Sequence, residues 1–163
     1  MKKYIYIIIG LLVLAGIVWL IVTPGKTRKK LGESFAIQGQ EHIDIGASHI
    51  AYNSNPPTSG PHYAQPAKWG VYDKELADEQ LIHNLEHGGI WISYTGIDDE
   101  TKTKLEKLTQ SYVKIIVEPR AKDDALIVLV SWGRLQKFQS YDEQGIVAFI
   151  KANTNQSPEP FAP

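Results

Sequence analysis

The sequence contains no cysteine, and its one methionine is Met1. Disulfides therefore cannot stabilise the fold, and cysteine usage does not report the redox compartment. The lack of sulfur also disfavours a copper(I) or iron–sulfur site, because both prefer thiolate or thioether ligands. A metal bound by this chain must be held by nitrogen and oxygen, which leaves zinc or copper(II) as the candidates, with zinc slightly favoured.

Acidic residues are absent from the first thirty positions, which hold six of the 17 lysines and arginines. Residues 31–163 therefore carry 11 basic against 18 acidic side chains, a formal charge of −7. A nucleic-acid-binding face needs a concentration of basic residues to displace counterions from phosphates. Since no such stripe is visible, the sequence predicts no nucleic-acid partner.

Charges are also absent from residues 4–22, a run of 19 residues that are mostly isoleucine, leucine and valine. A helix of this length measures about 29 Å, close to the hydrocarbon thickness of a bilayer. We expect residues 1–23 to be an uncleaved, single-pass transmembrane anchor, with the lipid bilayer as its partner. The alternative is a cleaved signal peptide, but its apolar region usually spans about 7–15 residues and ends in a small-residue cleavage site.

Basic residues flank this run on both sides, so the positive-inside rule does not give a single orientation. A short basic head kept in the cytoplasm favours an extracytoplasmic C-terminal domain at the cell membrane. The basic residues at 26–30 favour the opposite orientation. We predict the outward-facing arrangement, with residues 24–34 as a juxtamembrane linker and residues 35–163 as one soluble domain.

Residues 52–72 contain four prolines in 21 positions, too many for a helix or a central strand. We expect an ordered loop there, anchored by its aromatic side chains. Hydrophobic periodicity and capping signals predict helices over about 73 or 78 to 87, 98–111 and 142–152, and strands over 42–45, 90–94, 113–117 and 125–132. The predicted fold class is α+β, with an N-terminal transmembrane helix and one small domain that has a short sheet and three helices packed on one face.

All five histidines lie between residues 42 and 87. His83 and His87 are four positions apart in HNLEHGG, so both imidazoles project from one face of the predicted helix together with Glu86. His62 lies in the nearby loop sequence PPTSGPH. Such an i, i+4 pair with a third histidine from a loop can bind one ion. We predict a metal site of His62, His83 and His87, with Glu86 as a fourth ligand or as the partner that orients one imidazole.

HNLEH also fits H-x-x-E-H, the inverted form of a zinc metallopeptidase motif. In this alternative the chain is a small metal-dependent hydrolase, and Glu86 is the general base that acts on a metal-bound water. The pattern fixes only three of five positions and therefore recurs by chance. Glu159, 72 residues after His87, is a candidate acidic ligand, but it lies in a terminal loop and His62 is the more economical third ligand.

Two hypotheses without a metal remain open. A histidine near a helix C-terminus interacts well with the helix dipole, so the same residues can serve in capping and packing. The chain can also be an interaction module, in which the proline-rich loop and the aromatic residues bind an envelope protein. His42 and His49 lie outside the two motifs and are less favoured as ligands.

The segments YNSNPPTSGPHY, KWGVY and HNLEHGGIWISY, and more loosely EPR and SWGR, resemble a family of mostly bacterial, membrane-anchored proteins. This family is catalogued as domain of unknown function 3105, and the resemblance spans about residues 40–160. It implies a membrane helix followed by one domain, with His62, His83, Glu86 and His87 at signature positions. The family has no established activity, so the resemblance supports the importance of these residues without indicating a reaction.

Overall fold

The structure is a computed structural model that describes residues 12–14 and 29–162. Its main element is a mixed six-stranded sheet of order β1-β8-β7-β5-β6-β4. The strands are β1 Glu33–Ser34, β4 Gly70–Val71, β5 Ile90–Tyr94, β6 Ile115–Pro119, β7 Ile127–Ser131 and β8 Arg134–Phe138. Strand β6 pairs in parallel with β4 and β5, whereas the β5–β7, β7–β8 and β8–β1 pairs are antiparallel.

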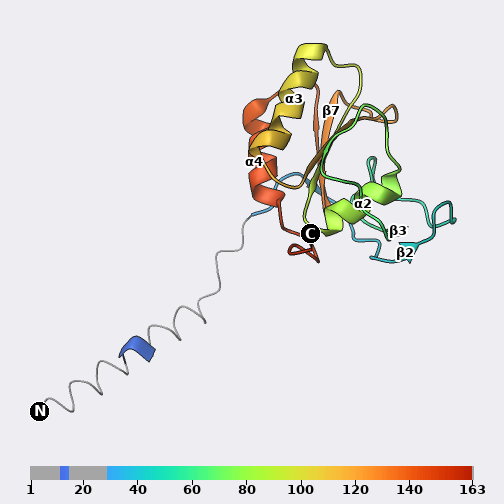
Figure 1. Cartoon of the computed structure of the whole chain (residues 1–163), viewed down its shortest axis with the longest axis vertical. Helices are drawn as coiled ribbons and strands as arrows, with labels where there is room; N and C mark the ends of the chain where they lie inside the picture. Colours follow the sequence, from blue (N-terminus) through green and yellow to red (C-terminus); the bar gives the residue numbers. More distant parts are fainter. Residues whose placement is uncertain (1–11, 15–28, 163) are drawn as a thin grey trace, which may run out of the picture.

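Within residues 29–162, helices cover both faces of this sheet. They are α2 Asp78–Glu86, α3 Asp99–Ser111 and α4 Glu143–Asn153. Figure 1 shows α3 and α4 on one side of the sheet and α2 on the other. A hydrophobic core lies on each face of the sheet, and strand β5 contributes to both. Ile90 and Ile92 pack with α3 and α4, while Trp91 packs with α2. A strand that is apolar on both faces needs a cover on each of them.

The predicted fold class is wrong in three respects. The sheet is large and mixed rather than short, a second sheet accompanies it, and α2 lies on the opposite face from α3 and α4. In this sheet, β8 and the edge strands β1 and β4 were not among the predicted strands. The edge strands have two residues each, too few to produce a periodic signal. A continuous apolar run such as β7 also does not reveal which face a helix will cover.

The predicted transmembrane helix is a further part of this correction. Among residues 12–14 and 29–162, no helix is long and apolar enough to cross a membrane. The sequence predicts that helix over residues 4–22, of which only Leu12–Leu14 belongs to the part that the structure describes. The rest of the predicted anchor and residues 24–28 of the predicted linker lie outside the described residues.

The proline-rich segment is an ordered loop, and it includes a strand of the second sheet. This sheet pairs β2 His42–Ile43 in parallel with β3 His62–Tyr63. The Tyr52 hydroxyl donates to the carbonyl of Pro61 at 2.6 Å. Gly60 has a φ of +123°, and a Cβ there would lie 3.0 Å from the Tyr52 ring. The glycine is therefore required for the close turn that directs the chain into His62.

A buried arginine fixes the start of α2 relative to this loop. Arg120, which is 2% exposed, donates from Nε and Nη2 to the two carboxylate oxygens of Asp78 at 3.0 and 2.9 Å. Its Nη1 donates to Asp123 and to the side-chain oxygen of Asn55, both at 2.7 Å. The bidentate contact holds the planar guanidinium in one orientation. Arg120 therefore joins α2, the β6–β7 connection and the proline-rich loop.

Candidate metal centre

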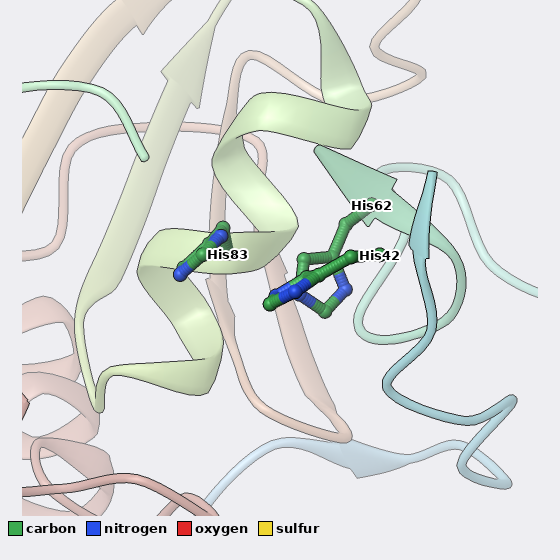
Figure 2. Close-up of side chains that lie close together, drawn as sticks. All are labelled: His42, His62 and His83. Atoms are coloured by element: carbon green, nitrogen blue, oxygen red, sulfur yellow. The ribbon is translucent and has the colours of Figure 1, made fainter. Parts of the chain in front are cut away.

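Three histidines from three different elements converge beside α2. They are His42 of β2, His62 of β3 and His83 of α2, shown together in Figure 2. Each offers a ring nitrogen, and these atoms lie within 4.8 Å of one another. The His62 and His83 rings are buried, whereas the His42 side chain is 52% exposed. The group, called here the histidine trio, is thus mostly enclosed but open to solvent at His42.

The parallel pairing of β2 with β3 places two members of the trio side by side. His42 and His62 are direct partners in the register, and their ring centroids lie 4.9 Å apart. The His83 ring lies 5.0 Å from His42 and 5.1 Å from His62, again between centroids. The trio is therefore assembled by strand pairing and by the contact of α2 with β3, although 41 positions separate His42 from His83 in the sequence.

The two buried rings have their tautomers set by the backbone. Nδ1 of His62 lies 2.8 Å from the carbonyl oxygen of Gly60, and Nδ1 of His83 lies 2.7 Å from that of Tyr63. A carbonyl oxygen only accepts, so each Nδ1 carries a proton, and in a neutral ring Nε2 then has the lone pair. Metal-binding imidazoles commonly show this outer hydrogen bond to a carbonyl. The donor chemistry of the two rings therefore fits a divalent transition metal.

The surroundings of the His83 ring disfavour its protonation. Burial lowers its pKa, the hydrogen bond to Tyr63 opposes this effect, and the neighbouring histidines His87, His62 and His42 lower it further. The ring is therefore neutral at pH 7, which is the form that binds metals.

Glu86 is buried against the trio, as the shared helix face predicted. Its Oε2 lies 3.0 Å from Nε2 of His62 and 3.9 Å from Nε2 of His42. Its Oε1 accepts from the side-chain amide of Gln40 at 2.8 Å. A neutral His62 would direct a lone pair at the carboxylate, so this contact needs a proton or a cation shared between the two groups.

His87 contacts the trio through His83. Their Nε2 atoms lie 3.0 Å apart, and their ring centroids lie 4.5 Å apart. On its other side, Nε2 of His87 lies 3.6 Å from Oε2 of Glu159. His87 is therefore adjacent to the trio rather than part of it.

The glycines of HNLEHGG let other segments approach the end of α2. A Cβ on Gly89 would clash with the Trp69 ring, and one on Gly88 would lie 2.8 Å from Cα of Asn155. Gly88 also has a φ of +82°, the left-handed conformation that commonly ends helices. These glycines place His87 at the point where the helix stops.

The structure thus brings together some of the residues predicted from the sequence. His62 and His83 lie in the trio with Glu86 beside them, while the role predicted for His87 as a ligand stays a prediction. His42 was missed as a member, although it falls in the histidine-rich segment and in the strand predicted over 42–45. His49 lies elsewhere, 3.2 Å from Glu79.

A comparison with protein families places this site within a known domain. A family model described as "Protein of unknown function (DUF3105)" matches residues 42–163. The chain belongs to the DUF3105 family. The matched region of this DUF3105 chain includes the trio, Glu86 and His87, and the family expected from PPTSGPH and HNLEHGG is confirmed. No match was found among curated proteins or among solved structures.

Proposed function

We propose that the chain binds one divalent transition metal ion, zinc or copper(II), through His42, His62 and His83. The observation that carries the proposal is the pair of Nδ1–H contacts that His62 and His83 make to backbone carbonyls. These contacts leave Nε2 as the metal-binding atom of each ring, in exchange for its contact with Glu86 in His62 and with His87 in His83. His42 adds a third imidazole from the strand paired with that of His62.

A role in capping or packing accounts for fewer of these contacts. The helix dipole favours histidines at the C-terminal end of α2, where His83 and His87 lie. It gives no reason for His42 and His62 to approach the same point from a separate sheet. A common ligand for the imidazoles supplies that reason, because each ring nitrogen then binds a partner that all three share.

Glu86 supports metal binding better than it supports hydrolysis. A general base needs a carboxylate oxygen directed at a metal-bound water. Both carboxylate oxygens of Glu86 already have partners, since Oε1 accepts from Gln40 and Oε2 contacts His62. We therefore assign Glu86 the role of the group that orients His62, and we favour metal binding over the hydrolase hypothesis.

The test is elemental analysis of the full-length chain, purified without a tag or a chelator. We expect close to one equivalent of zinc or copper in the wild type, and a large loss of metal in a His62→Ala/His83→Ala variant. His42→Ala tests the same site with less risk to folding, because that side chain is 52% exposed. His49→Ala is the matched control, since His49 pairs with Glu79 away from the trio. A wild type that binds neither ion, even after titration with both, would overturn the proposal.

A further inference from the structure

The C-terminal tail, residues 155–162, is fixed against the end of α2. The backbone N–H of Asn155 donates to the carbonyl of Gly88 at 2.9 Å, and that of Glu159 donates to the carbonyl of Glu86 at 3.1 Å. The missing side chain of Gly88 makes room for Asn155. The tail therefore returns to the same turn of α2 that carries the candidate metal ligands.

Lys114 binds the part of the tail that follows Glu159 in the sequence. Its Nζ donates to the backbone carbonyl of His87 at 2.9 Å, and to those of Pro160 and Ala162 at 3.1 and 2.8 Å. One ammonium group with three donors thus links the end of α2 to the residues that follow Glu159. Glu159 is held from both directions, by its own backbone and by Lys114.

This arrangement forms a path of ligand atoms from solvent to the trio. The Glu159 side chain is 58% exposed, and its Oε2 lies 3.6 Å from Nε2 of His87, whose side chain is 10% exposed. Nε2 of His87 lies 3.0 Å from Nε2 of the buried His83. A carboxylate, an imidazole and a second imidazole therefore follow one another inward, all of them groups that bind zinc and copper(II).

We propose that His87 and Glu159 form an outer position for the metal ion, and that His83 is a ligand common to this position and the trio. The inference rests on the proposed function. The His83 Nε2 has a single lone pair, so one ion occupies either position but two ions do not occupy both. The ion reaches the trio by exchanging Glu159 and His87 for His42 and His62 while it stays bound to His83. The exposed carboxylate attracts the hydrated cation and raises its local concentration at the outer position.

The experiment measures rates as well as affinity. Zinc is mixed with the metal-free full-length chain in a stopped-flow instrument, and its removal by a chromophoric chelator is followed separately. We expect Glu159→Gln to slow both loading and release about tenfold. The stoichiometry stays unchanged, because the ion is finally bound by the trio. The affinity also stays unchanged, because it is the ratio of the release rate to the loading rate and both fall by the same factor. Lys114→Met, which frees the tail, changes the rates in the same direction.

Glu100→Gln is the matched control, because it makes the same charge change on α3, where Glu100 pairs with Lys104. Its rates should equal those of the wild type. Equal rates in Glu159→Gln and the wild type would overturn the outer position while metal binding stands, and the ion then enters past the exposed His42. A loss of affinity in Glu159→Gln as large as that in His42→Ala would make Glu159 a permanent ligand, which also contradicts the inference. A wild type without metal would remove both proposals.

Discussion

Nε2 of His62 lies 3.0 Å from Oε2 of Glu86, and neither side chain is more than 4% exposed. The other ring nitrogen of His62 is engaged with the carbonyl of Gly60. The contact therefore depends on a proton between the nitrogen and the carboxylate oxygen or on a metal ion bound to both atoms, in a place that water does not reach freely.

Glu86→Gln tests whether this contact serves metal binding. We expect the affinity for zinc to fall about 10–100-fold, because the amide is neutral and no longer orients or binds as a carboxylate does. The measurement is competition with a chelator of known affinity. Glu79→Gln is the control, since Glu79 is the other glutamate of α2 and lies 3.2 Å from His49. Equal affinity in Glu86→Gln and the wild type would show that Glu86 has no part in the site.

His42→Ala should separate binding from folding. The side chain is 52% exposed, so we expect the unfolding free energy of the metal-free chain to change by no more than about 0.5 kcal/mol. Zinc at about 100 times the wild-type Kd should stabilise the wild type by about 2.7 kcal/mol and the variant by much less. Urea denaturation with and without zinc measures both effects. The same zinc-dependent stabilisation in both chains would exclude His42 from the ligand set.

Arg120→Met should destabilise the fold by about 3–5 kcal/mol, because it removes the cation that faces the carboxylates of Asp78 and Asp123, whose side chains are 15% and 0% exposed. Lys137→Met is the control with the same change of charge. Its partner Asp124 lies 2.7 Å away, but both side chains are well exposed. We expect that variant to lose about 0–1 kcal/mol. Urea denaturation of the two variants side by side makes the comparison, and similar losses would contradict the role given to Arg120.

Glu118 should make the stability of the fold fall as the pH rises. Burial raises the pKa of this carboxyl to about 8, from an ordinary value of 4.5. Between pH 4.5 and about pH 8 the folded chain keeps a proton on Glu118 that the unfolded chain has lost. The protonated carboxyl therefore contributes its full stabilisation below the unfolded-state pKa, and this contribution is lost as the pH rises through the folded-state pKa.

The measurement is the unfolding free energy of the wild type and of Glu118→Gln at a series of pH values. We expect the wild type to lose stability relative to the variant between about pH 5 and pH 8, by an amount on the order of a few kcal/mol. The slope is the relevant quantity, because the amide also changes local hydrogen bonding at every pH. Parallel pH profiles for the two chains would contradict the raised pKa.

Local signals in the sequence were sufficient for the helices and for several strands. Asp98 and Asp142 begin α3 and α4 because their side chains accept from the backbone N–H of Thr101 and Gly145. Gly88 ends α2 by a left-handed turn. The same helical period places His83 and Glu86 on one face. These features depend on residues within a few positions of one another, which is why the sequence alone determined them.

The tertiary structure decided which distant residues lie beside His83 and Glu86. His42 enters the trio because β2 pairs with β3, and a strand of two residues contains no local pattern that names its partner. Glu159 reaches His87 because Gly88 and Lys114 receive the tail. The side of the sheet that α2 covers follows from the apolar surface that Trp91 presents there. Each of these contacts depends on the packing of the whole domain, so the sequence determined the chemical groups and the fold determined the site that they form.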